Sequence, residues 1–286
     1  MNRLATMAMA NILALMSSAL WGTSDFLGGT AARTRPAWVV LVWSQAIAFV
    51  VVALAAWVHG DFAAMTPGPW MVWAAAAGVC GAVGIICLYR ALAEGTMGVV
   101  SPIVALGVLV PFTAGLVVGD TLSNTHIFGV VAAIVGIVLA SAPEVTGKAG
   151  WRPVMYAIAA AVLLGSSMLG LAFGAEGSVL VTLVIMRAAA AVVAPIACMR
   201  SAQMRGLPPR LLGLYAVIGI IEVIANATFG FSKIMPGASL ALISVLGSLY
   251  PITTVVLAAV VHKERMAVVQ YIGVAFAMTG VAFVCV

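Results

Sequence analysis

Charged residues are scarce in this chain. Only 7% of its 286 residues are Asp, Glu, Lys or Arg, whereas 64% are hydrophobic and the mean hydropathy is +1.22. Soluble domains carry about 25% charged residues and bury their apolar side chains in a core of limited size. A chain of this composition cannot hide its apolar surface in such a core. We therefore predict an integral all-α membrane protein in contact with the lipid bilayer.

Residue types that bind metals or perform catalysis are also scarce. The four cysteines lie in apolar runs without a Cys-x-x-Cys pair, and the three histidines fall near the ends of such runs. Neither set has the spacing of a zinc site. The sequence contains no His-Glu-x-x-His, Gly-x-Ser-x-Gly or P-loop motif. We expect no metal, no cofactor, no ATP hydrolysis and no enzymatic activity from this chain.

Long apolar runs fill most of the sequence. A helix needs about 20 apolar residues to cross the hydrocarbon core of a bilayer. The first run follows Arg3, as in a secretory signal, but many equally apolar runs come after it, so we interpret it as an uncleaved span. We predict ten transmembrane helices, at 8–27, 37–58, 70–91, 97–118, 124–141, 152–172, 178–199, 211–231, 237–260 and 267–285.

The basic residues are distributed unevenly between the two sides of this predicted bundle. Ten of the 13 fall in or beside loops that follow odd-numbered spans, Arg3 and Lys233 fall on the opposite side, and Arg187 lies inside a span. Positively charged loops remain in the cytoplasm. We therefore predict a multi-pass protein of the plasma (inner) membrane with both termini outside. Topology thus accounts for the net charge of +5, and we expect no nucleic acid partner.

The two halves of the chain share a pattern. An acidic residue at 120 is followed by glycines nine and then seven residues later, and the same spacing recurs from residue 264. In the second span of each half, Gln45 aligns with Arg187. Five spans per half reverse the direction of the second half, so we predict two inverted five-helix repeats, residues 1–146 and 147–286, with a substrate site between them.

Two smaller features of the repeats carry further expectations. The acids Asp120 and Glu264 precede the closing helix of each half, and we expect them to complement helix N-termini. The glycines that follow lie on one face of each closing helix, which predicts close packing between the halves. Prolines interrupt corresponding spans, as they do around the substrate sites of transporters with inverted repeats. We therefore expect helix breaks and gating at Pro102, Pro111 and Pro251.

Short motifs along the chain resemble those of one family. They are "LWGTSDF" at 20–26, "YRALAEG" at 89–95, "VGDTL" at 118–122 and "YIGVAFAMTGVAF" at 271–283. In this order and spacing they resemble the EamA-type branch of the drug/metabolite transporter superfamily, over nearly the whole chain.

The resemblance implies two five-helix repeats and a transporter of amino acids, other small metabolites or cationic drugs. It also implies an arginine in the second helix of a repeat, which Arg187 matches and Gln45 does not. The Gly-Glu pair usual before the last helix is represented by Gly119-Asp120 and Lys263-Glu264.

A few polar side chains lie inside the predicted spans. An ionisable group costs at least about 2.5–3.5 kcal/mol at mid-depth, so it must face protein or water. Arg187 and Glu222 form either a structural ion pair between sequential helices or a pair that also binds a substrate carboxylate. Asp25 is either an interfacial acid or a carboxylate that binds a cation or takes up coupling protons. The candidate substrate-binding residues are Trp21, Ser24, Asp25, Gln45, Arg187, Glu222 and Asn226.

These features predict a secondary transporter that moves a small organic solute by alternating access. The favoured substrate is an amino acid or a related metabolite, exported from the cell. The alternative is efflux of drugs or lipophilic cations, in which Asp25 or Glu222 would bind the cation and Arg187 would be structural. A membrane-embedded enzyme lacks a catalytic set, and duplicated halves with broken helices disfavour a channel or scaffold. The sequence leaves the oligomeric state open, a monomer included.

Overall fold

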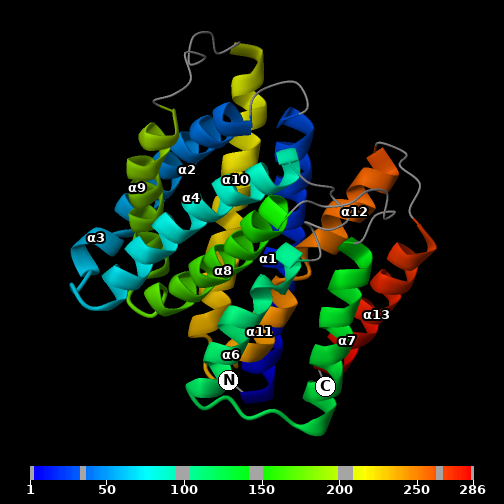
Figure 1. Cartoon of the computed structure of the whole chain (residues 1–286). Coiled ribbons are helices and arrows are strands. Elements are labelled where there is room, and N and C mark those ends of the chain that lie inside the picture. The colour runs from blue at the N-terminus through cyan, green and yellow to red at the C-terminus, as the bar shows by residue number, and fades with distance from the viewer. Residues whose placement is uncertain are drawn as a thin grey trace.

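The structure, a computed structural model, is a bundle of helices (Figure 1). It describes residues 3–32, 37–94, 103–141, 151–198, 209–261 and 267–284. The first half contains α1 (Arg3–Ala32), α2 (Ala37–His59), α3 (Asp61–Ala64), α4 (Trp70–Glu94), η1 (Leu106–Val108), α6 (Leu109–Val117) and α7 (Asn124–Ser141). The second half contains α8 (Trp151–Gly174), α9 (Val179–Cys198), α10 (Pro209–Ile234), α11 (Leu240–Gly247), α12 (Tyr250–Val261) and α13 (Val268–Val284).

Each predicted span corresponds to helical structure in the described residues. Five helices are long and apolar enough to cross a membrane, judged by length and composition, and they belong to α1, α2, α4, α8 and α10. Shorter apolar helices occupy the other predicted spans, and the fourth and ninth spans are divided into pieces. The all-helical prediction is therefore confirmed, whereas ten uninterrupted transmembrane helices are not.

The two divided spans break at corresponding places. In the fourth span, the 3-10 turn η1 comes directly before α6, whose third residue is Pro111. In the ninth span, α11 ends at Gly247 and α12 begins at Tyr250, one residue before Pro251. Proline lacks the N–H that would bond to the preceding turn, and its ring crowds that turn. Pro102 lies outside the described residues.

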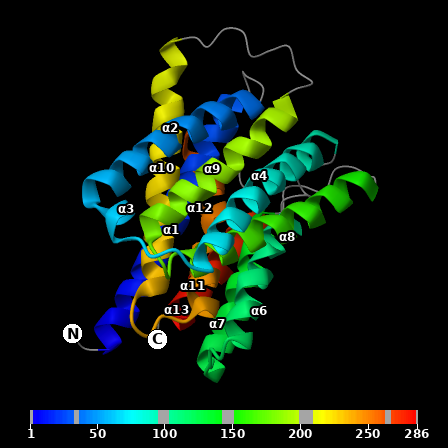
Figure 2. The same ribbon diagram turned by 90° about the vertical axis from the view of Figure 1, so that its left-hand side faces the viewer.

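Helices of one half pack mainly against helices of the other half. The packing of α4 on α8 is matched by that of α1 on α10, and the packing of α4 on α9 by that of α10 on α2. The pairs α2–α9 and α7–α13 join equivalent helices of the two halves, and α6 packs on α11 across the halves. Figure 2 shows α4 beside α8 in the turned view. The largest contacts are thus repeated with the halves exchanged, which is the pattern of a pseudo-two-fold axis between two repeats.

Glycines permit the closest of these helix approaches. A methyl group added to Gly78 of α4 would lie 2.8 Å from the Cα of Met186 in α9, closer than real Cβ atoms come. Gly219 of α10 approaches the backbone of Ser44 in α2 in the equivalent way. The closing helices α7 and α13 meet at Gly129, Gly136, Gly273 and Gly280. The predicted packing of these glycines between the halves is confirmed.

Both ends of the chain lie at the same end of the bundle (Figure 1). We call this the termini end. The connections from α2 to α4, from α6 to α7, from α8 to α9 and from α10 to α11 also lie there. The connections at the termini end therefore fall within the described residues, and so do the contacts that the two halves make there.

Candidate functional site

Three polar side chains form a closed network where α2, α9 and α10 meet. Arg187 Nη1 donates to Glu222 Oε1 at 2.9 Å and also to Gln45 Oε1. Gln45 Nε2 donates to Glu222 Oε2 at 2.6 Å. The side chain of Arg187 is 7% exposed and that of Glu222 is 20% exposed. The ion pair expected between sequential helices is present, and Gln45 from the other half completes it.

This network lies at the pseudo-symmetry axis. Gln45 and Arg187 occupy equivalent positions of the two halves, and equivalent residues can touch each other only near the axis that exchanges them. The register of Gly78 and Gly219 makes Gly81 the equivalent of Glu222, so the acid has no counterpart in the first half. Both ionisable groups of the network therefore belong to the second half, and their equivalents in the first half, Gln45 and Gly81, are uncharged.

Trp21 and Asn226 lie beside this network and join α1 to α10. Trp21 Nε1 donates to Asn226 Oδ1 at 3.0 Å, and the Trp21 ring packs against the ring of Phe229 at a centroid distance of 5.5 Å. Asn226 is buried and lies one turn after Glu222 on the same face of α10. Ser24 Oγ donates to the backbone oxygen of Ile218 at 3.4 Å, so this hydroxyl contacts the backbone of α10.

Asp25 lies on the interior face of α1, yet its side chain is exposed. Asp25 lies one turn after Trp21 and Gly22 and therefore shares their face of α1. Gly22 packs on Tyr250 of α12. Asp25 makes no hydrogen bond or ion pair with the part of the chain that the structure describes. Its carboxylate is close enough to Glu222 for charge repulsion. An exposed carboxylate without a partner in the described residues thus lies near Glu222 of α10 and Tyr250 of α12.

Arg187 keeps one edge of its guanidinium unused. Nε and Nη2 are buried and have no hydrogen-bond partner in the described part of the molecule. These two nitrogens form the edge that binds a carboxylate or phosphate through two parallel hydrogen bonds. Glu222 uses only Nη1. The site therefore contains two unsatisfied groups of opposite sign, the Arg187 edge and the Asp25 carboxylate.

Carboxylates also join the two halves at the termini end. Asp120 Oδ2 accepts hydrogen bonds from Ala241 N at 2.8 Å and from Ser239 Oγ at 3.0 Å, where α11 begins. Asp61 Oδ1 accepts one from Ser178 Oγ at 3.2 Å, just before α9. The expectation that Asp120 complements a helix N-terminus is confirmed, but the helix belongs to the other half. No local pattern in the sequence signals this partner; Glu264 lies outside the described residues.

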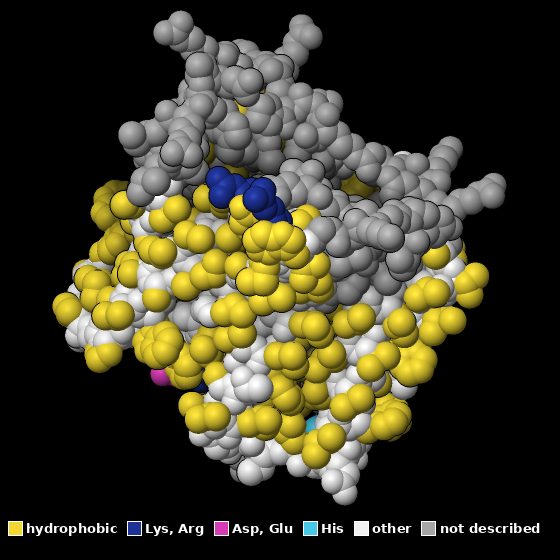
Figure 3. All heavy atoms as spheres, viewed as in Figure 1, with side chains coloured by type: hydrophobic (Ala, Val, Ile, Leu, Met, Phe, Trp, Pro, Cys, Tyr) yellow, Lys and Arg dark blue, Asp and Glu magenta, His cyan; other side chains and the backbone are white. Residues whose placement is uncertain are grey.

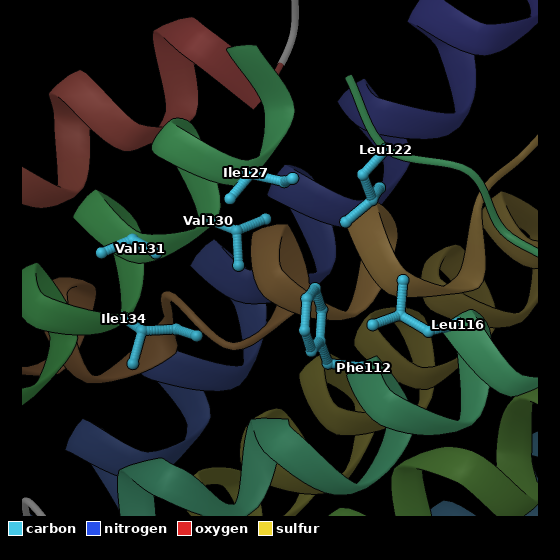
Figure 4. A pocket seen from close by; sticks show the side chains of 7 residues that line it. All are labelled: Phe112, Leu116, Leu122, Ile127, Val130, Val131 and Ile134. Carbon is cyan, nitrogen blue, oxygen red and sulfur yellow. The ribbon is translucent and has the colours of Figure 1, made fainter. Parts of the chain in front are cut away.

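A hydrophobic groove of about 470 Å³ lies between α6 and α7 (Figure 4). Its lining contains no ionisable side chain and no candidate substrate-binding residue, so we assign it no substrate chemistry. The lining residues are Phe112, Leu116, Leu122, Ile127, Val130, Val131 and Ile134.

Comparison with known proteins identifies two repeats. The model of the EamA-like transporter family matches residues 8–142 and 151–286. A solved crystal structure of a protein, one of 27 matching chains, superposes with a TM-score of 0.76. It covers 96% of this chain and 95% of that chain at 19% sequence identity, which supports the fold alone. Among curated proteins, none matches this chain.

Proposed function

This chain belongs to the EamA-like transporter family, a transporter family of the drug/metabolite transporter superfamily and not an enzyme family, and on that premise we propose its substrate and mechanism. It is a multi-pass membrane protein. The proposed activity is secondary transport by alternating access. The proposed substrate is an amino acid or a related metabolite, which the chain exports across the plasma membrane.

We propose ten membrane passes in two inverted repeats, with both termini outside. The exchange of contacts between the halves and the location of both chain ends at the termini end support the ten passes and the two repeats. The uneven distribution of basic residues supports the orientation. Single cysteines placed at residues 34 and 64 will distinguish the two orientations in intact cells. A membrane-impermeant maleimide should label residue 64 and not residue 34, and the reverse pattern would place the termini inside.

The proposed substrate site uses the two unsatisfied groups at the middle of the bundle. The Nε and Nη2 edge of Arg187 would receive the substrate carboxylate, because that edge is the single buried guanidinium edge in the described residues without a partner. Gln45 and Glu222 would hold Nη1 and orient that edge. Asp25 would receive the substrate ammonium group, beside Trp21. The Arg187 edge is buried here, so binding requires a separation of helices, which alternating access provides.

Efflux of a lipophilic cation is the second candidate function. One arrangement favours it: two acidic side chains, Asp25 and Glu222, lie near each other, and Arg187 is the one cation near them among the described residues. If both acids are ionised, the site carries an excess negative charge, and a substrate cation would balance it. Arg187 would then serve only to hold Glu222.

Thermal unfolding of the purified chain in the presence of ligands tests both functions. The panel contains amino acids, aromatic metabolites, sugars and quaternary ammonium compounds. A ligand stabilises the folded state by about 2.7 kcal/mol at a hundred times its dissociation constant. We expect a zwitterionic amino acid to raise the melting temperature.

Matched ligands provide the control for this experiment. The amide of the stabilising amino acid lacks the carboxylate, its N-acetyl form lacks the ammonium group, and both should stabilise less. Stabilisation by quaternary ammonium compounds alone would indicate that the substrate is a lipophilic cation and that Arg187 has a structural role.

A further inference from the structure

A second basic site lies at the start of α8, apart from the substrate site. The guanidinium carbon of Arg152 lies 5.7 Å from the ring centre of Trp151, and that of Arg90, at the end of α4, lies 6.0 Å from the ring centre of Tyr156. Both arginines are exposed. Neither forms an ion pair with any acid in the described ranges of the chain. Two guanidinium groups are therefore held by aromatic rings without a counter-charge.

A cavity of about 390 Å³ lies beside Arg152 and beside Tyr156, the ring that Arg90 approaches. It is lined by Trp151, Arg152, Met155 and Tyr156, all in the first two turns of α8. The first turn of a helix has backbone N–H groups without helical partners, and these add positive potential. The cavity thus combines a guanidinium group, aromatic rings and a helix N-terminus, a set of groups that favours an anion.

An apolar ridge continues from this cavity along α8. Met155, Ile158 and Val162 are 56%, 45% and 51% exposed, and their spacing places them on one face of the helix. Figure 3 shows Lys and Arg side chains gathered directly above a hydrophobic area on the face seen in Figure 1. Because α8 is long and apolar enough to cross a membrane, this ridge faces the acyl chains of the bilayer.

We propose that Arg90, Arg152, Trp151 and Tyr156 form a binding site for the headgroup of an anionic phospholipid. The phosphate would accept charge-assisted hydrogen bonds from both guanidinium groups, and one acyl chain would lie along the ridge. Aromatic side chains at a bilayer interface and basic pockets beside membrane helices favour such headgroups. Free phosphate shares the headgroup chemistry, but the ridge continuous with the cavity favours the lipid. This proposal does not depend on the identity of the transported solute.

Native mass spectrometry of the detergent-purified chain tests the site. Phosphatidylglycerol and phosphatidylcholine with the same acyl chains are titrated against the unchanged chain and against the double variant Arg90→Gln/Arg152→Gln. We expect phosphatidylglycerol to bind about tenfold more tightly than phosphatidylcholine, and the double variant to lose this preference. Lys233→Gln is the control, because it removes a positive charge at the termini end, where Lys233 pairs with Glu176, and the preference should persist.

A second measurement keeps the test independent of the folding of the double variant. Phosphatidylglycerol with brominated acyl chains should quench the tryptophan fluorescence of the unchanged chain more than brominated phosphatidylcholine does, and Trp151→Phe should remove that difference. Equal binding of the two lipids, or an unaltered preference in a folded double variant, would overturn the site. Displacement of phosphatidylglycerol by millimolar inorganic phosphate would indicate that the site binds a soluble phosphate and not a lipid.

Discussion

The variants Arg187→Gln and Glu222→Gln will each unfold more readily than the unchanged chain, and the double variant will recover stability without recovering transport. Removing one member of a buried ion pair costs about 3–5 kcal/mol, because an uncompensated charge remains. Replacing both members is often neutral, and two glutamines can still bond to Gln45. The loss should be larger for Glu222→Gln, because Arg187 is 7% exposed whereas Glu222 is 20% exposed and reaches water more easily.

Transport separates the two roles that an ion pair at this position can have. A purely structural pair would let the stable double variant move its substrate, whereas a substrate-binding Arg187 makes that variant inactive. The measurement pairs thermal unfolding in detergent with counterflow of the stabilising ligand in proteoliposomes. Lys233→Gln is the control, because Lys233 pairs with Glu176, which is 52% exposed, and such pairs contribute about 0–1 kcal/mol. Native transport by the double variant would show that Arg187 does not bind substrate.

The sequence predicts much of the fold because crossing a bilayer imposes a length. The apolar runs locate each span, and the prolines at 111 and 251 locate the two breaks. The sequence does not reveal which face of each helix is buried, because lipid and protein interior are equally apolar. In α10, Phe229 is fully buried while Phe231 is 39% exposed, although the two residues are identical in chemistry.

The candidate site could be predicted only as far as residue type indicates it. A charge inside an apolar span is conspicuous, so Arg187 and Glu222 stand out in the sequence. Their contact with Gln45 depends on how the halves pack, and no local periodicity encodes it. The same limit applies to Asp120, whose partner Ser239 lies 119 residues away in the other half. Contacts between the halves are therefore what the structure adds to the sequence.

The variant Asp120→Ala should shift the transporter toward a state that is open at the termini end. In this structure the carboxylate of Asp120 bridges the halves through Ser239 Oγ and Ala241 N, next to the closely packed Gly115. Hydrogen bonds to a charged group contribute about 1.5–3 kcal/mol, and a loss of that size changes a two-state equilibrium by about 10- to 150-fold. Ser239 Oγ still accepts from Leu242 N in the variant, so the start of α11 keeps its cap.

A cysteine at residue 241 will report this opening. Ala241 is fully buried against Gly115, so in a background without the four native cysteines the Ala241→Cys thiol should react slowly with a bulky maleimide. Asp120→Ala should raise that rate at least about tenfold, because separation of α6 from α11 exposes the thiol. Glu176→Gln is the matched control: it removes a carboxylate at the same end whose partner, Lys233, belongs to its own half. An unchanged labelling rate in a folded Asp120→Ala variant would mean that Asp120 only caps α11. A faster rate would mean that the carboxylate holds the two repeats together and that its release accompanies opening.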